Sequence, residues 1–373
     1  MPLPADYGGV IDVCCRLKAL TSIGVQVKLH CFTYGRQPSP ELEQICSEVY
    51  YYPRDLSLLR HFDHRPFIVA SRHSNSLLNR ILSDDDPVLI EGVHGTLLLE
   101  QLRQMEAIQR LKPRRVVVRA HNVEQRYYRL LSHSERNLLR RAYLWTESLK
   151  LRHYEPVLRM ADAVVAVNDS DADFFRRMGC RNVVTLPVFY PDIDYSQTND
   201  TVTPFDNTPF VLYHGDLSVP DNQWAVRRVL QLADKLPYQL VVAGRNPSHS
   251  LRRNIQRTPH AVLVESPDER LMTALQRKAQ CTVLLTRQPT GFKVKLLVSL
   301  TEGKHCIVNS AMVASTGLAP LCTVADTPAA LHEALLHLMQ KPFTDKDRQH
   351  RMDVLKHNHS NIEHARHLMQ LFA

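Results

Sequence analysis

Two lysines that follow a glycine turn are the residues of this chain best suited to bind a phosphate group. The segment 290–297 reads TGFKVKLL, and it should open a helix that leads into a strand at 305–309. The first turn of a helix offers unpaired backbone N–H groups and the positive end of the helix dipole, which together suit a diphosphate. If both lysines are fully helical, Lys293 and Lys295 lie about 200° apart around that helix, so at most one would then face the ligand, and we favour Lys293.

Short β-branched runs alternate with helical patterns along the chain, and these elements must position the lysine loop. The runs lie at 25–32, 87–92, 115–119 and 162–167 in the first half, and at 209–215, 238–244, 261–264, 281–285 and 305–309 in the second. Such alternation predicts an α/β fold with parallel sheets covered by helices on both faces. Ligands of such sheets bind at the carboxyl ends of the strands, so we expect a site in a cleft between two units.

A polar interval divides the chain into two domains. We expect a Rossmann-like domain at 1–190, a linker at 191–207, a second Rossmann-like domain at 208–345, and a C-terminal helix at 346–373 that packs back toward the first domain. Too few apolar residues precede the Gly8-Gly9 turn to form a first strand. Either the natural chain starts upstream, which we expect, or the first sheet lacks a central strand.

Taken in order, these segments resemble the retaining GT-B glycosyltransferases of family 4, which move a sugar from a nucleotide-diphosphate donor. The resemblance covers nearly the whole chain and rests on segments 4–9, 120–124, 152–168, 213–218, 242–247 and 290–309. The lysine loop is similar to the Gly-x-Lys-x-Lys variant of some members. The resemblance implies a GT-B fold with both sheets facing a central cleft, and a retaining, hexosyltransferase-like enzyme in which the leaving phosphate takes the acceptor proton.

The matching segments give an expected set of site residues. The expected catalytic residues are His121, Thr290 and Lys293. The expected donor-binding residues are Gly8, Gly9, Gly215, Arg245, Ser266, Gly291, Phe292 and Lys295. Asn122 and Glu124 are expected on the acceptor side. No metal and no cofactor beyond the nucleotide-sugar substrate are expected. For His121 and the Gly8-Gly9 turn, a purely structural role is the alternative.

Two departures from the family pattern bear on donor chemistry. Thr290 and Val298 stand where members usually have two glutamates, for the transferred sugar and the ribose. Asp216 and Asp221 stand where an arginine and a lysine are common, and two anions would repel a diphosphate if they faced it. Lys293, the loop amides and Arg245 would then have to stabilise the leaving group. The alternative is a non-catalytic GT-B-like protein that acts as a binding or regulatory partner.

The net charge of +8 arises within residues 101–160, which hold fourteen Arg or Lys against five Glu. This excess favours contact with an anionic membrane surface or acceptor, although solvated helix faces are an equal alternative. No zinc spacing, aromatic RNA-binding motif or helix-turn-helix supports nucleic-acid binding. Eight cysteines without metal-ligand spacing fit a reducing compartment. We therefore expect a cytoplasmic enzyme of polysaccharide biosynthesis, peripheral on the inner face of the membrane, with a glycan or lipid-linked acceptor.

Overall fold

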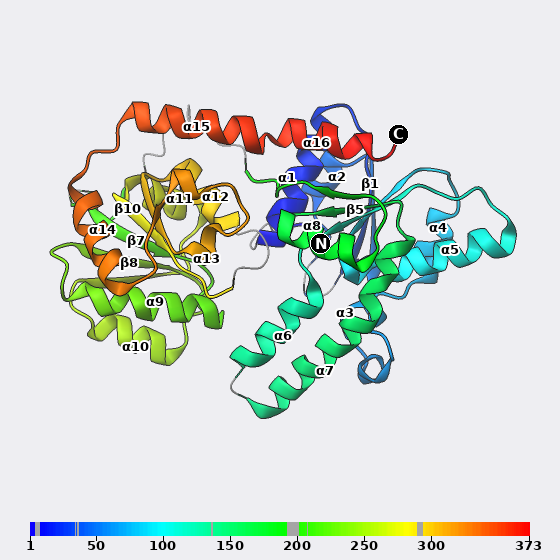
Figure 1. Cartoon of the computed structure of the whole chain (residues 1–373), viewed down its shortest axis with the longest axis horizontal. Helices are drawn as coiled ribbons and strands as arrows, with labels where there is room; N and C mark the ends of the chain where they lie inside the picture. The colour runs from blue at the N-terminus through cyan, green and yellow to red at the C-terminus, as the bar shows by residue number, and fades with distance from the viewer. Residues whose placement is uncertain are drawn as a thin grey trace. The chain divides into compact units, whose positions relative to one another are not determined.

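The computed structural model divides the chain into two α/β units (Figure 1). It describes residues 1–3, 8–33, 35, 37–135, 137–191, 201–206, 208–288 and 294–373, with the side chains of 357 and 358 left aside. The first unit comprises residues 1–190 and 359–373, and the second unit comprises 191–288 and 294–358. Every strand pairing in the described residues is parallel, which confirms the α/β class expected from the alternating pattern.

The first unit contains two parallel sheets. β1 (Lys28–Thr33) pairs with β2 (Glu48–Pro53), and β3 (Val88–Glu91), β4 (Val116–Ala120), β5 (Ala163–Ala166) and β6 (Val183–Thr185) form a separate four-stranded sheet in that order. The α-helices are α1 (Gly8–Ser22), α2 (Pro40–Ile45), α3 (Phe67–Ala70), α4 (Asn75–Ile81), α5 (Leu97–Gln109), α6 (Glu124–Ser134), α7 (Leu138–Tyr154), α8 (Asp169–Met178) and α16 (Asn361–Gln370). Short 3₁₀ turns are η1 (Leu58–Phe62), η2 (Val93–Gly95) and η3 (Glu155–Met160).

Apolar strands and capped helices explain these elements. β4 reads VVVRA, and all five of its residues are buried, as expected for a central strand of a parallel sheet. The side chain of Asn168 caps α8 by accepting the N–H of Asp171, and Gly179 ends that helix in the left-handed region. The C-terminal helix α16 packs on α1, where Ala365 joins the apolar cluster of α1 and β5. The end of the chain is therefore part of the first core.

The second unit is built on one six-stranded parallel sheet with the order β12-β11-β10-β7-β8-β9. Its strands are β7 (Phe210–His214), β8 (Gln239–Gly244), β9 (Ala261–Glu265), β10 (Cys281–Leu284), β11 (His305–Val308) and β12 (Thr323–Val324). Its helices are α9 (Pro220–Ala233), α10 (His249–Arg257), α11 (Glu269–Lys278), α12 (Val294–Glu302), α13 (Ser310–Val313), the turn η4 (Ala319–Leu321), α14 (Pro328–Gln340) and α15 (Asp345–His359), whose last residue belongs to the first unit.

The strand order of the second unit reverses direction at its centre. From β7 the chain proceeds through β8 to β9 on one side, and it then returns to β10 and proceeds to β12 on the other. β7 and β10 are adjacent, with Val211 opposite Cys281. In open parallel sheets, such a switch point leaves a crevice at the carboxyl ends of the two central strands, and ligands bind there. A ligand-binding site is therefore expected among the residues that follow β7 and β10.

The backbones at the ends of β7 and β8 approach too closely for a side chain. A Cβ atom on Gly244 would lie 1.9 Å from the carbonyl oxygen of Gly215. Replacing Gly244 by Ala should therefore lower the free energy of unfolding of the second unit by about 3 kcal/mol, as in other overpacked sites. Urea unfolding followed by Trp224 fluorescence in a Trp145→Phe background would measure this loss.

The matched control is Gly317→Ala, because Gly317 has a positive φ of 71° but no atom within 4 Å of an added Cβ. Its cost should be about 1 kcal/mol, from backbone strain alone. Equal losses in the two variants would contradict the steric explanation.

Candidate functional site

A lysine lies at the carboxyl end of β7, beside the switch point of the second unit. Lys295 is in the first turn of α12, and its Nζ donates to Oδ1 of Asn222 at 2.9 Å. The same Nζ lies 5.5 Å from the centre of the Tyr213 ring, near enough for a cation–π contact. Asn222, on α9, is itself fixed, because its Nδ2 donates to the carbonyl of Asp216 at 2.8 Å. Three elements thus bring a positive charge to this edge.

Asp216 and Asp221, expected to repel a diphosphate, both have partners. The carboxylate of Asp216 accepts Nε of Arg245 at 3.1 Å and Oγ of Ser218 at 2.6 Å. Although burial opposes its charge, these contacts hold the pKa of Asp216 below its ordinary value. Asp221 accepts Oγ1 of Thr286 at 2.5 Å, which ties α9 to the end of β10. These contacts partly offset the expected repulsion, and Arg245 is ion-paired rather than a freely available cation.

A buried histidine that the sequence analysis did not select also shapes this edge. The Nε2 atom of His214, the last residue of β7, lies 2.7 Å from Oγ of Ser299 on α12. Burial, together with the charge of Lys295, lowers the pKa of His214 to about 3, so its imidazole is neutral. The sequence offered one signal for His214, its position directly before Gly215 at the end of a predicted strand. His214 joins β7 to the helix that carries Lys295.

The other predicted donor residues are distributed as follows. Gly215 follows β7 and lies beside Asn222. Ser266 follows β9 in an exposed left-handed turn, and its N–H donates to the carbonyl of Gly244 at 2.9 Å. Thr290, Gly291, Phe292 and Lys293 lie outside the residues that the structure describes. The second unit therefore brings Gly215, Arg245 and Lys295 to one edge of its sheet.

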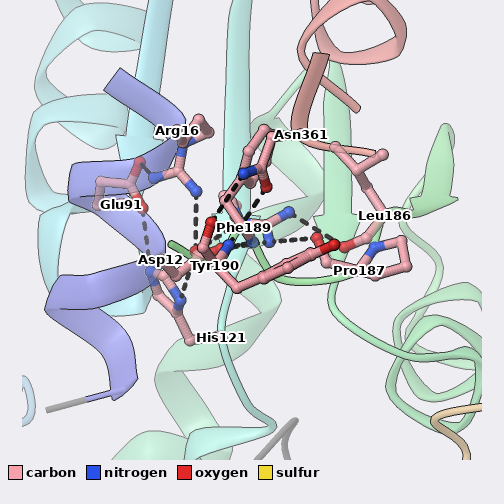
Figure 2. Close-up of polar contacts among 10 residues, drawn as sticks. Asp12, Arg16, Glu91, His121, Leu186, Pro187, Phe189, Tyr190 and Asn361 are labelled. Carbon is pink, nitrogen blue, oxygen red and sulfur yellow. Dashed lines mark hydrogen bonds and ion pairs between the residues drawn. The ribbon is translucent and has the colours of Figure 1, made fainter. Parts of the chain in front are cut away.

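A buried carboxylate joins the elements of the first unit. Asp12, on α1, accepts Nε and Nη2 of Arg119, each at 3.0 Å, and Nη1 of Arg16 at 2.9 Å (Figure 2). It also accepts the backbone N–H of Phe189 at 2.6 Å. Although burial opposes its ionisation, the two arginines hold the pKa of Asp12 well below its ordinary value. The carboxylate is therefore charged and fully paired.

The same network fixes the segment that ends the first unit. Arg119, on β4, donates to the carbonyl oxygens of Leu186 and Pro187 at 3.2 and 2.9 Å. The side chain of Asn361 on α16 holds both backbone groups of Tyr190, donating to its carbonyl at 2.7 Å and accepting its N–H at 3.2 Å (Figure 2). Side chains of β4, α1 and α16 thus all hold residues 186–190 in place.

His121 is held between two carboxylates at the carboxyl end of β4. Its Nε2 lies 3.0 Å from Oε2 of Glu91, and its Nδ1 lies 3.6 Å from Oδ2 of Asp12 (Figure 2). Burial of Glu91 opposes its charge, but Arg16 and His121 lower its pKa below the ordinary value. The imidazole is partly exposed, and the two carboxylates fix its orientation. Gly8 and Gly9 begin α1, the helix that carries Asp12.

A second pair of carboxyl groups lies at the start of α6. Burial, reinforced by the charge of Glu155, raises the pKa of Glu124 to about 7. Glu155 accepts the N–H of Gln125 at 2.9 Å, so it caps the amino end of α6. Asn122 forms a side-chain hydrogen bond with Glu124. The first unit thus places His121, Asn122 and Glu124 in one short segment after β4, with a carboxyl group that titrates near neutral pH.

The comparisons with known proteins show the fold. No family model matches the chain. An uncharacterized 44.6 kDa protein in the cps region of Klebsiella pneumoniae is 25% identical over 261 residues, which are 65% of this chain and 62% of that protein, so the match spans less than two thirds of the relative.

Among solved structures, the chain is similar to a glycosyltransferase from Rickettsia africae, with a TM-score of 0.62 and 11% identity over 98% of this chain and 94% of the other. It is equally similar to a trehalose-6-phosphate protein from E. coli bound with UDP-2-fluoro glucose, with a TM-score of 0.62 and 11% identity over 98% and 95%. For the α,α-trehalose-phosphate synthase (UDP-forming) of Burkholderia vietnamiensis the TM-score is 0.58, with 13% identity over 87% and 88%. The chain has the GT-B fold, as predicted; the cleft between the units and the residue roles stay predictions.

Replacing Asp12 by Asn tests the network of the first unit. The change keeps the shape but removes the charge that faces Arg119, so it should lower the free energy of unfolding by about 3–5 kcal/mol. The folded-state pKa of Asp12 is depressed, so its contribution is present above the ordinary carboxyl value of about 3.9 and is lost as the pH falls. Urea unfolding can be followed by Trp145 fluorescence in a Trp224→Phe background. The difference in the free energy of unfolding between Asp12→Asn and the parent should become smaller below about pH 4.

Asp173→Asn is the matched control, because Asp173 pairs with Arg176 on the surface of α8 and its side chain is 56% exposed. Its loss should stay below about 1 kcal/mol. A loss for Asp12→Asn as small as this would show that the buried carboxylate does not hold the unit together.

Proposed function

We propose that this protein is a glycosyltransferase that takes a sugar from a nucleotide-diphosphate donor bound at the carboxyl ends of β7 and β10. The observation that carries the proposal is Lys295, a positive charge fixed by Asn222 at the switch point of an open parallel sheet. The neighbouring E. coli structure was bound with UDP-2-fluoro glucose, and the Burkholderia enzyme is UDP-forming. Those properties of two proteins with the same fold support a nucleotide sugar as the donor here.

The chemistry proposed for this edge is stabilisation of the leaving diphosphate. Lys295, Lys293 and the amides of Gly291 and Phe292 would carry that charge, and Thr290 would hydrogen-bond a sugar hydroxyl. Arg245 is ion-paired with Asp216, so we propose that it orients the loop after β7 and contributes less positive charge to the phosphate. This arrangement supports a retaining transfer in which the departing phosphate takes the acceptor proton. We propose no metal and no further cofactor.

The acceptor side is proposed to lie in the first unit, after β4. His121 has a fixed orientation between Glu91 and Asp12, and Glu124 has a pKa raised to about 7 by burial. A fixed imidazole can bind and orient a sugar hydroxyl, and a carboxyl group with such a pKa can exchange protons near neutral pH. We propose a glycan or lipid-linked acceptor, as in polysaccharide biosynthesis.

The second candidate is a non-catalytic protein of the same fold that binds a partner. Its support is Val298, a partly buried aliphatic residue on α12 that cannot bind a ribose diol. The ion pairs of Asp216 with Arg245 at 3.1 Å and of Asp221 with Arg287 at 3.5 Å weaken the remaining argument for it, since each carboxylate has a cation beside it.

Thermal unfolding with a panel of nucleotides separates the two candidates. A saturating nucleoside diphosphate at about 100 times its Kd should stabilise the folded protein by about 2.7 kcal/mol, which corresponds to a rise in Tm of about 5 °C or more. Lys295→Ala should remove most of this rise, and Lys293→Ala should reduce turnover by about 10²–10³-fold with a nucleotide-sugar donor.

Lys346→Ala is the control, because Lys346 is exposed on α15 and carries the same charge. It should leave both the Tm rise and the turnover unchanged. If no nucleotide raised the Tm, the non-catalytic candidate would be favoured. If the rise in Tm persisted in Lys295→Ala, the phosphate would not bind at this lysine.

A further inference from the structure

Three helices of the first unit surround a cavity rich in arginine. The cavity has a volume of about 760 Å³ and is lined by side chains of α6, α7, η3 and α8. Arg126 and Arg129 come from α6, Arg152 from α7, and Arg177 from α8, while the described lining residues include no Asp or Glu. Its volume suits a small ligand or a headgroup, and its charge suits an anion.

Three of these arginines have uncommitted guanidinium groups. Arg126 lies over the ring of Phe174 at 4.5 Å, but the guanidinium groups of Arg129, Arg152 and Arg177 make no hydrogen bond or ion pair with any described residue. Glu155 precedes the lining residue Pro156, is fully buried, and accepts hydrogen bonds from the backbone and side chain of Gln125. Free guanidinium groups bind phosphate through paired hydrogen bonds, which makes phosphate the best match.

Nearby carboxylates do not neutralise the cavity either. Glu147, on α7, is buried and accepts both Nζ of Lys150 at 3.1 Å and the N–H of Phe67 at 2.7 Å. Asp173, on α8, is paired with Arg176 at 2.7 Å. These carboxylates therefore leave the positive charge of the cavity able to attract an anionic ligand.

An apolar stripe on α7 leads away from the arginines. At about 100° per residue, Leu138, Trp145 and Leu149 fall within about 40° of one another around the helix axis. Leu138 is 76% exposed and Trp145 is 51% exposed, and the adjacent Leu139 is 84% exposed. The two helices α6 and α7 run side by side as a hairpin (Figure 1). The amino end of α7 therefore presents two leucines to solvent.

A second exposed apolar group lies beside α7. In η1, Leu58, Leu59 and Phe62 are 77%, 80% and 87% exposed. The ring of His61 contacts the edge of Tyr143 on α7, with centroids 5.6 Å apart, so η1 and α7 are neighbours. Tyr143 lies about 160° around α7 from Trp145, so η1 packs on the side of the helix that faces away from the cavity. The exposed apolar residues nearest the arginines are therefore those of α7, and large apolar side chains beside arginines mark a membrane-facing or protein-facing surface.

We propose that the cavity binds the phosphate headgroup of an anionic membrane lipid, while the exposed apolar residues of α7 enter the lipid layer. The free arginines supply the charge complementarity, and Trp145 lies between the arginines and the exposed leucines, as tryptophan does at membrane interfaces. Among the helices that the structure describes, none combines the length and apolar character needed to cross a bilayer, so the contact is peripheral. The proposal does not depend on glycosyl transfer.

Vesicle flotation of the full chain tests the proposal. Vesicles of phosphatidylcholine alone should bind weakly, and adding phosphatidic acid should increase binding at least about tenfold. The double variant Arg152→Glu, Arg177→Glu should lose at least about tenfold of that binding. In a Trp224→Phe background Trp145 is the only tryptophan, so its emission should shift to shorter wavelength with the acidic vesicles.

The matched control is Arg253→Glu, Arg257→Glu on the exposed face of α10, which makes the same change of charge in the second unit. It should keep vesicle binding within about twofold of the parent. Equal losses in the two double variants, or an unchanged Trp145 emission, would overturn the proposal. Soluble glycerol 3-phosphate is the remaining arm: thermal stabilisation by it without vesicle binding would assign the cavity to a soluble phosphate and would also overturn the lipid proposal.

Discussion

The first unit depends on the charge of one buried carboxylate. Asp12 receives the guanidinium groups of Arg119 and Arg16 and the backbone N–H of Phe189, so a helix, a central strand and the segment after β6 are held at a single point. Burying such charges costs free energy that only complete pairing offsets, and here each carboxylate oxygen has at least two donors. Because His121 contacts the same carboxylate, the orientation of the imidazole follows from the network that stabilises the unit.

The second unit uses backbone proximity and paired charges in place of a buried network. The missing side chains of Gly215 and Gly244 let β7 and β8 end in contact, and the strand order reverses beside them. Asp216 is ion-paired with Arg245 and Asp221 with Arg287, and Lys295 adds a positive charge that Asn222 holds in place. A site of this kind can stabilise a leaving phosphate without a nucleophile from the protein.

The sequence sufficed for the fold class and most strands, because runs such as 115–119 have a local signature. It did not predict β2 (Glu48–Pro53), which is rich in tyrosine, or β6 (Val183–Thr185) and β12 (Thr323–Val324), which are too short to show a pattern and are defined by their pairing. The sequence analysis also missed Asp12 and Arg16. Their spacing of four residues on a helix is typical of a pair on the surface, whereas their burial depends on Arg119, which is 107 residues from Asp12. An arginine inside the apolar run VVVRA was the available signal. The pairing of Asp216 and Asp221 likewise depends on distant residues.

The central claim is that a nucleotide diphosphate binds at the carboxyl ends of β7 and β10. Backbone hydrogen exchange, measured with and without UDP or GDP, tests it most directly because it locates the ligand without assuming turnover. The account predicts slower exchange in 215–222 and 285–288 and in the first turn of α12. Nucleotide binding that leaves these segments unchanged, or that protects only the first unit, would contradict it.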